Sequence, residues 1–325
     1  MLDWRVDTFL DVCETLNYTH TAARLNITQP AVSQHIAWLE KQYETPLFSR
    51  KGRTLVLTDA GKEVAEVLLS QRNDENLLKQ ELSTLNSGVS KLVIGATLTA
   101  GEFMLARPLA RWCSDHPLVQ VRVVMADTAD LLSDLDKGAI DCALVEGIFD
   151  STKYSFREWS YEQMKCVCAC GSKVAIGASK VDSGILAANN TPLRFRDLLE
   201  NTLIIREQGS GSRAVLEACL ARNNLVPESF KRVIEVKGVG LGLEMVRAGT
   251  GITFAYESAV SHRLAQGELH VISAQGICHT QGELQEIKLC EEGLGHSICF
   301  VWRRNSFFEK RFIQLFEELQ HLLPK

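Results

Sequence analysis

Two short polar runs of this sequence have the residue types that bind small molecules. The first, residues 97–101, places Thr97 and Thr99 between an apolar segment and a segment of helical pattern. The second, residues 206–213, combines glycines that permit close backbone approach, serines that donate hydrogen bonds, and an arginine at each end. Helix starts attract negative groups, and guanidinium groups bind carboxylates. Both runs are candidates for binding a small oxyanion, with helix capping by Thr99 and Ser212 as the alternative.

A third group of residues has the chemistry of DNA recognition. Gln29, Pro30 and Ser33 lie at the start and on the outer face of a predicted helix. Glutamine can pair bidentately with adenine, and a serine hydroxyl can contact a base or a phosphate. A basic turn at residues 50–53 lies between two strand-like pieces and predicts a wing that reaches phosphates or a minor groove. The candidate DNA contacts are Thr28, Gln29, Pro30, Ser33, Gln34, Arg50 and Arg53.

Other groups of reactive or glycine-rich residues do not point to catalysis. On a strand, Cys166, Cys168 and Cys170 would face one way at intervals of about 6.6 Å, so a buried strand face is favoured over a redox or metal site. Residues 238–242 lack the glycine spacing of a dinucleotide loop and predict a tight turn into a helix that lines the binding cleft. With no set of nucleophile and base and no metal-ligand spacing, we expect no catalytic residue, metal or cofactor.

The DNA-recognition residues need helices to position them, and the apolar spacing supplies three. Two of these helices meet at a tight link, which is typical of a helix-turn-helix. Asn26 stands in the link where glycine is common, and asparagine tolerates the left-handed conformation. The predicted helices span residues 4–16, 21–25 and 29–43.

Charge is distributed unevenly along this first part of the chain. Residues 1–15 carry a net charge of −3 and residues 24–53 a net charge of +3, against −5 for all 325 residues. The positive charge therefore collects where DNA phosphates would lie. The alternative is a three-helix protein-binding module with a solvated basic face, since the whole chain has no general attraction for DNA.

A long stretch from residue 59 to residue 88 predicts a linker helix. Thr58 can cap its start and Gly88 can end it. Its apolar stripe is too intermittent for a strict coiled coil, so the helix is either a solvent-spanning strut or a dimerising element. The stripe consists of Val64, Val67, Leu68, Leu78, Leu82 and Leu85.

After residue 88, apolar runs alternate with helical segments, which predicts parallel α/β units. In such sheets ligands bind beyond the carboxyl ends of the strands, where the two polar runs lie. A final amphipathic helix is expected over residues 307–323. The predicted strands span residues 92–96, 121–125, 142–145, 203–205, 233–236 and 252–255.

The DNA-recognition segment closely resembles the winged-helix signature of LysR-type transcriptional regulators. The resemblance lies in the run Thr21–Ser33, then Ile36, Leu39, Glu40, residues 47–50, Arg53 and residues 57–61. Residues 44–46 depart from the family, which usually has a glycine or a similar small turn there. The resemblance implies a multidomain α and α/β fold, with an N-terminal winged helix-turn-helix, a long linker helix and a two-lobed effector domain like a periplasmic binding protein.

The resemblance also implies domain boundaries and a site. The DNA-binding domain spans residues 1–58, the linker 59–88 and the effector domain 89–325, with lobe one at about 91–162 and 270–302 and lobe two at about 163–269. Asp127, Glu146 and Glu207 would oppose an anion in the cleft unless they are paired or turned away, so the effector's charge stays open. The implied effector contacts are Thr97, Thr99, Ala100, Thr128, Gln208, Gly209, Ser210 and Ser212.

These observations together predict a sequence-specific transcriptional regulator, and not an enzyme. Its DNA-bound oligomer is expected to be modulated by a small-molecule effector in the cleft of the C-terminal domain. Its expected partners are an operator of dyad symmetry, a small-molecule effector with small anions as one class, itself as a homodimer or homotetramer, and RNA polymerase. The N-terminal residues do not have the pattern of a secretory signal and no apolar run approaches the ~18 residues of a membrane span, so a cytoplasmic protein without a membrane partner is expected. The alternative is a cytosolic small-molecule-binding protein or enzyme with a helical protein-interaction N-terminus.

Overall fold

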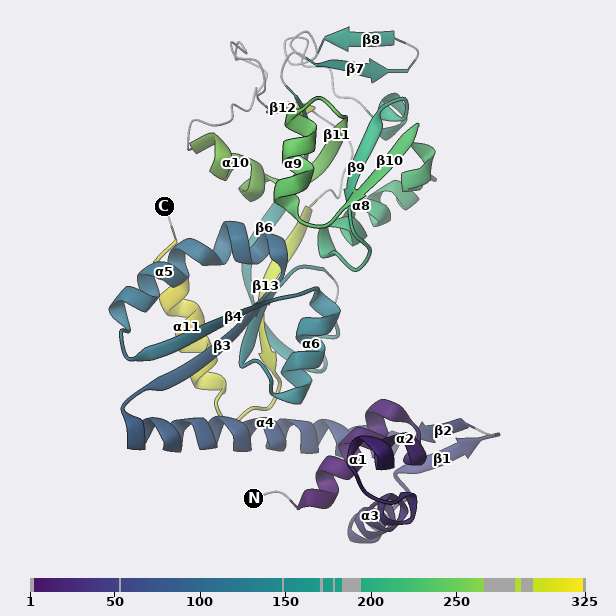
Figure 1. Ribbon diagram of the computed structural model, residues 1–325, viewed down its shortest axis with the longest axis vertical. Helices are drawn as coiled ribbons and strands as arrows, with labels where there is room; N and C mark the ends of the chain where they lie inside the picture. The colour runs from purple at the N-terminus through teal and green to yellow at the C-terminus, as the bar shows by residue number, and fades with distance from the viewer. Residues whose placement is uncertain are drawn as a thin grey trace.

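The computed structural model describes residues 3–52, 54–147, 149–169, 172–177, 179–182, 194–265, 284–287 and 295–323. Arg53 and Cys170, both named in the sequence analysis, lie outside these ranges. A small helical domain, a long helix and a two-lobed α/β region follow one another along the chain (Figure 1). Across the described ranges, none of the helices has the length and apolar character to cross a membrane.

The N-terminal domain contains the predicted helix-turn-helix and wing. Its apolar faces meet in a core that includes Phe9, Val32 and Leu47. Asn26 has φ of +54°, which confirms the left-handed conformation expected in the turn. The elements are α1 Trp4–Thr15, α2 Tyr18–Arg24, α3 Gln29–Gln42, β1 Phe48–Lys51 and β2 Thr54–Leu57, with β1 and β2 antiparallel.

The turn that leads into the wing, residues 44–46, has no glycine. Glu44 adopts φ of +52°, the region that glycine favours, so the turn keeps its direction with a non-glycine residue. Glu40 then holds the start of the wing, because its Oε1 accepts hydrogen bonds from the backbone N–H groups of Leu47 at 2.8 Å and Phe48 at 3.3 Å. The carboxylate thereby fixes the hairpin against α3.

Helix α4, Asp59–Ser87, has the two caps predicted for the linker. Thr58 accepts a hydrogen bond from Gly61 N, and Gly88 ends the helix with φ of +69°. The helix runs along the base of the first lobe in Figure 1. Its apolar residues divide between two faces, since Leu68 is buried whereas Val67, Leu78, Leu82 and Leu85 are exposed.

One face of α4 is bound to the first lobe by buried polar contacts. Arg303 is only 4% exposed and forms ion pairs with Glu66 of α4 and, at 2.7 Å, with Asp136. Asn73 donates a hydrogen bond to the carbonyl of Leu135 at 2.7 Å. Helix α4 is therefore not a strut surrounded by solvent.

The α/β region contains all six predicted strands, in two parallel groups. In the first lobe, β3 pairs in parallel with β4 and β5; in the second, β9 pairs in parallel with β10 and β11. The strands run β10-β9-β11-β6-β13-β5-β3-β4, with β12 paired to β6. Their bounds are β3 Ser90–Ala96, β4 Val119–Met125, β5 Cys142–Val145, β9 Thr202–Arg206, β10 Arg232–Val236 and β11 Ile252–Tyr256.

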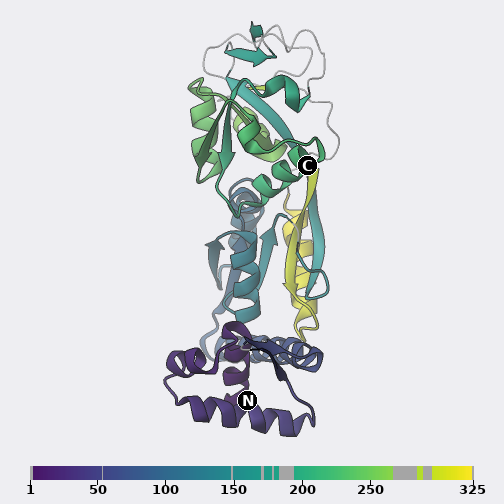
Figure 2. The same cartoon turned by 90° about the vertical axis from the view of Figure 1, so that its right-hand side faces the viewer.

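Two long antiparallel strands connect the lobes, as the side view shows (Figure 2). Strand β6, Tyr154–Ala169, pairs with β13, Gly295–Arg303, in the first lobe, and with β11 and β12, Leu284–Ile287, in the second. Strand β12 pairs with the second-lobe part of β6, at residues 166–169. This pairing joins segments that are distant in the sequence, and the local pattern does not show it.

Helices pack on the main sheet, and buried side chains fill the space between them, while β7 and β8 form a separate two-stranded sheet. Cys166 and Cys168 are each 1% exposed on β6, as predicted for a buried strand face. The predicted C-terminal helix buries Phe312, Leu315 and Leu319. The remaining elements are η1 Ala100–Leu105 (a π-helix), α5 Ala106–Asp115, α6 Thr128–Lys137, β7 Lys173–Ile176, β8 Ser179–Asp182, η2 Phe195–Leu198, α8 Gly211–Arg222, η3 Pro227–Ser229, α9 Val239–Arg247, α10 Glu257–Ala265 and α11 Glu309–His321.

Candidate functional site

Helix α3 presents the candidate DNA contacts on its outer face. Gln29, Pro30, Ser33 and Gln34 are exposed, while the opposite side of the helix is buried in the domain core. Thr28 precedes the helix and caps it, accepting a hydrogen bond from Ala31 N at 3.3 Å. The first turns of α3 therefore offer amide and hydroxyl groups to a partner outside the domain.

The wing adds positive charge beside this helix. Arg50 and Lys51 are exposed at the end of β1. Arg50 lies opposite Leu55 in the hairpin register, and Leu55 packs against the domain core. The core thus supports a basic hairpin tip, which has the geometry needed to contact phosphates.

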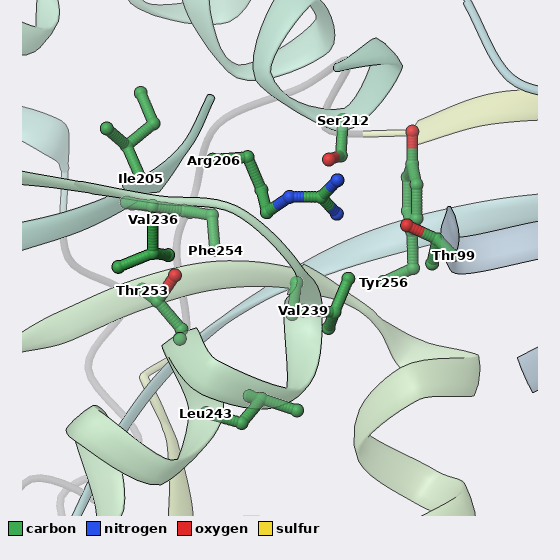
Figure 3. A pocket seen from close by; sticks show the side chains of 12 residues that line it. Thr99, Ile205, Arg206, Ser212, Val236, Val239, Leu243, Thr253, Phe254 and Tyr256 are labelled. Atoms are coloured by element: carbon green, nitrogen blue, oxygen red, sulfur yellow. The ribbon is translucent and has the colours of Figure 1, made fainter. Parts of the chain in front are cut away.

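A second candidate site is the interlobe pocket, defined by the residues that line it (Figure 3). Its volume is about 350 Å³, including its open mouth. Thr99 contributes from the first lobe, and the other lining residues come from the second, so the pocket spans both lobes. The lining residues are Thr99, Ile205, Arg206, Ser212, Val236, Val239, Gly242, Leu243, Thr253, Phe254, Ala255 and Tyr256.

The threonines after β3 have buried hydroxyl groups without partners. Thr97 is 2% and Thr99 1% exposed, and neither Oγ1 has a hydrogen-bond partner within the part of the chain that the structure describes. Thr99 precedes η1 but makes no side-chain capping bond. An unpaired buried hydroxyl costs about 1–3 kcal/mol, so capping does not explain these residues and a ligand would satisfy them. Ala100 follows as the fully buried first residue of η1.

The loop before α8 approaches the first lobe closely. Ser210 and Ser212 are buried, and their hydroxyl oxygens lie 2.9 Å apart in a hydrogen bond. Gln208 and Gly209 are exposed, and Gly209 has φ of +92°. A Cβ on Gly211 would lie 2.4 Å from Glu146 Cγ, so only glycine allows this approach of the two lobes.

Thr128 serves mainly to join two elements of the first lobe. Its Oγ1 donates a short hydrogen bond of 2.5 Å to the carbonyl oxygen of Glu146. This bond ties the start of α6 to the end of β5. Thr128 is one of the predicted effector contacts, but its hydroxyl proton already has an acceptor within the protein.

The two arginines of the polar run have different roles. Arg206 makes a double ion pair with Glu207, with both N–O distances 2.8 Å, but its Nη1 has no hydrogen-bond partner among the described residues. Arg213 donates to Glu217 at 2.7 Å, to Glu235 at 2.6 Å and to the carbonyl of Arg206 at 2.9 Å. The expectation that both arginines clamp a ligand is thus wrong for Arg213, because carboxylates of its own lobe occupy it.

Glu146 is a buried carboxyl group at the interface of the lobes. It is 2% exposed, and burial raises its pKa to about 7. The Arg206 guanidinium and the Tyr256 hydroxyl oppose this rise in pKa, whereas Asp127 and Glu207 add to it. Glu146 Oε2 has no well-formed hydrogen bond to any described residue. Of the acidic residues expected to oppose an anion, Glu207 is paired with Arg206, whereas Glu146 faces the Tyr256 hydroxyl.

Tyr256 is the pocket residue that the sequence analysis missed. It is 1% exposed at the end of β11, and its hydroxyl group likewise has no well-formed partner among the described residues. Figure 3 shows the Arg206 guanidinium between Ser212 and Tyr256, with Thr99 beside Tyr256. Its place at the carboxyl end of a predicted strand is the signal that marks ligand residues in α/β sheets.

A winged helix-turn-helix joined to a two-lobed α/β domain with a polar interlobe pocket defines a ligand-responsive DNA-binding protein. Comparison with known families agrees. The description "Bacterial regulatory helix-turn-helix protein, lysR family" matches residues 5–62, and "LysR substrate binding domain" matches residues 86–323. The chain belongs to the LysR family of transcriptional regulators, whose members bind DNA and small-molecule effectors, form oligomers and are not enzymes.

Curated relatives of this chain are transcriptional regulators of similar length. The regulator CysL of Bacillus subtilis is 27% identical over 271 residues, covering 82% of this chain and 84% of that protein. The regulator CbbR of Rhodospirillum rubrum is 26% identical over 269 residues, covering 82% of this chain and 83% of that protein.

Solved structures share the fold of the whole chain. A hydrogen-peroxide-bound OxyR variant of Corynebacterium glutamicum has a TM-score of 0.56 at 20% identity, covering 98% of this chain and 91% of that one. A full-length BenM variant has a TM-score of 0.54 at 18% identity, covering 98% and 95%. At these identities the likeness establishes the architecture and not the ligand.

Proposed function

We propose that the outer face of α3 and the wing read the operator. The observation that carries this proposal is the exposure of Gln29, Pro30, Ser33 and Gln34 on one face of a helix whose other face is buried. A recognition helix of this kind places its first residues against base edges in the major groove. Arg50 lies in the adjacent wing, where it supplies phosphate contacts, and Thr28 orients α3 through its cap. Arg53 is included on sequence grounds alone.

We further propose that the interlobe pocket binds the effector. Thr97, Thr99 and the Gln208–Ser212 loop are the contacts proposed from the sequence, together with Ala100 and Thr128. The buried hydroxyl groups without partners support the two threonines. Arg206 and Tyr256 join the set because their unpaired polar atoms are buried beside the same pocket. Effector binding across the lobes would shift the equilibrium between shapes of the oligomer and so alter the spacing and bend of the bound DNA. Strand β13 connects the lobes to α4 through Arg303.

The exposed apolar side chains of α4 are the proposed dimer contact. Leu78, Leu82 and Leu85 are 48%, 51% and 81% exposed at spacings of four and three residues. Burial of this stripe against a second copy would hold two DNA-binding domains at a fixed separation. Two such domains would require an operator of dyad symmetry. The proposal also includes action in the cytoplasm, assembly as a dimer or tetramer, and contact with RNA polymerase.

Fluorescence anisotropy with full-length protein tests the DNA contacts. The probes are the DNA upstream of the protein's own gene and a scrambled duplex, each across a salt series. Gln29→Ala should weaken binding to the specific site about 10-fold to 100-fold and leave binding to scrambled DNA unchanged, because a bidentate base contact discriminates by about 1–3 kcal/mol. Gln42→Ala, an exposed glutamine at the far end of α3, is the matched control. Equal loss in both variants, or loss on both duplexes, would contradict the proposal.

A further inference from the structure

Unpaired buried polar groups lie at and beside one end of the interlobe pocket. Arg206 and Thr99 line the pocket, whereas Thr97 and Glu146 directly follow β3 and β5 and are not among its lining residues. Arg206 Nη1 is a donor, the hydroxyl groups of Thr97 and Thr99 can donate or accept, and Glu146 Oε2, which faces the Tyr256 hydroxyl, is an acceptor when ionised. These residues are 9%, 2%, 1% and 2% exposed, respectively. Because a buried polar atom left unpaired is costly, the natural ligand must satisfy both the donor and the acceptor.

A purely anionic ligand fits this arrangement poorly. Glu207 already neutralises Arg206 through a double ion pair. Glu146 and Asp127 then remain as additional acidic groups close to the Arg206 guanidinium. A carboxylate alone would pair with Arg206 and the threonines but would face Glu146 at low dielectric without a cation between them.

A purely cationic ligand fits no better. It would pair with Glu146 but would add positive charge beside Arg206 Nη1. It would also leave the first turn of α8 without an acceptor, since Ser210 makes no side-chain capping bond there. An acceptor group at this place is favoured by the α8 dipole.

The opposite end of the pocket is apolar. Ile205, Val236 and Leu243 line it, and Figure 3 shows them on the side away from Tyr256 and Thr99, with Val239 nearer to Tyr256. This end therefore offers apolar contacts to a short aliphatic group next to the polar end.

From this geometry we infer that the effector is a zwitterion, an α-amino acid with a short aliphatic side chain. Its carboxylate binds Arg206 Nη1 and the threonine hydroxyls, its ammonium group binds Glu146, and its side chain enters the apolar end. This inference rests on the proposed function of the pocket as the effector site. It narrows the effector, whose charge the sequence leaves open, to one charge class.

Isothermal titration calorimetry on the full-length protein tests the inference with matched compounds. The probes are L-leucine, L-valine and L-norvaline, the 2-hydroxy acids of the same skeletons, and the corresponding primary amines. At least one amino acid should bind at least about 10-fold to 100-fold tighter than its hydroxy acid and its amine, since each analogue leaves buried groups unpaired. Equal or tighter binding of a hydroxy acid or an amine, or binding of none of the probes, would overturn it.

A charge-removing variant assigns the ammonium group to its partner. Glu146→Gln should weaken binding of the amino acid at least about 10-fold and weaken the hydroxy acid less or not at all. Glu102→Gln, the same change at an exposed position of the first lobe, should bind like the unchanged protein. Equal weakening of both compounds by Glu146→Gln would mean that Glu146 has no specific role toward the ammonium group.

Failure of this inference can be distinguished from failure of the proposed function. A broad panel of metabolites that includes sugars, nucleotides and dicarboxylates is titrated into the same protein. A ligand from another charge class that competes at the pocket would refute the zwitterion and retain the effector site. Absence of any small-molecule binding would remove both.

Discussion

Glu146→Gln should remove a pH-dependent part of the protein's stability. The Glu146 carboxyl group is 2% exposed, and burial raises its pKa from the usual 4.5 to about 7. The groups that face it are the Arg206 guanidinium and the Tyr256 hydroxyl, which lower the pKa, and the carboxylates of Asp127 and Glu207, which raise it. Glutamine has nearly the same shape but does not titrate.

The sign follows from proton binding in the two states. The folded protein binds the Glu146 proton more tightly than the unfolded chain, so this residue lowers the free energy of unfolding as the pH rises from 4.5 through 7. The difference between the two pKa values corresponds to about 3 kcal/mol. The stability of the Glu146→Gln variant relative to the unchanged protein should therefore increase by about 3 kcal/mol between about pH 4.5 and pH 8.

Urea unfolding at a series of pH values, followed by tryptophan fluorescence, measures this difference. Trp112, Trp159 and Trp302 all lie in the core of the α/β region and report its unfolding. Glu102→Gln serves as the control for removal of a carboxylate from an exposed position. Stability curves for Glu146→Gln and the unchanged protein that run parallel with pH would refute the reasoning, because they would mean that Glu146 titrates alike in both states.

Three further substitutions test other parts of the structure. Arg303→Met should destabilise the protein by about 1–3 kcal/mol in urea unfolding, because Glu66 and Asp136 lose their buried partner. Leu82→Lys should shift the oligomer toward monomer in analytical ultracentrifugation if α4 dimerises, whereas an unchanged mass would place the dimer contact elsewhere. Gly211→Ala should cost about 1–3 kcal/mol and weaken effector binding, since the new Cβ meets Glu146 at 2.4 Å; unchanged calorimetry would show that the lobes need not approach there.

Much of the N-terminal domain and of the sheet was predictable because its signals are local. Apolar spacing marks the inner faces of α1 and α3, and buried runs mark the strands around Ile94 and Ile204. The caps at Thr58 and Gly88 depend on the residues next to them and were predicted correctly. Asn26 could be placed in the left-handed region for the same reason.

The pocket was predictable only in outline. The sequence shows that two polar runs follow strands, and both runs do lie where the lobes meet. It does not show that Arg213 is occupied by carboxylates of its own lobe, or that Tyr256 completes the site. These partners are separated along the chain and are brought together by strand pairing.

The sequence by itself determined the class of protein: the helix-turn-helix with its wing, the linker helix with its caps, and the alternation of strands and helices. These features depend on residues within one or two turns of each other, where periodicity and capping act. Only the tertiary structure decided which polar groups stay unpaired, which face of α4 the Arg303 ion pairs occupy, and where β12 belongs. Burial and pairing between distant segments set those outcomes, and they change the pKa and the hydrogen-bonding needs of a residue such as Glu146 without any local trace in the sequence.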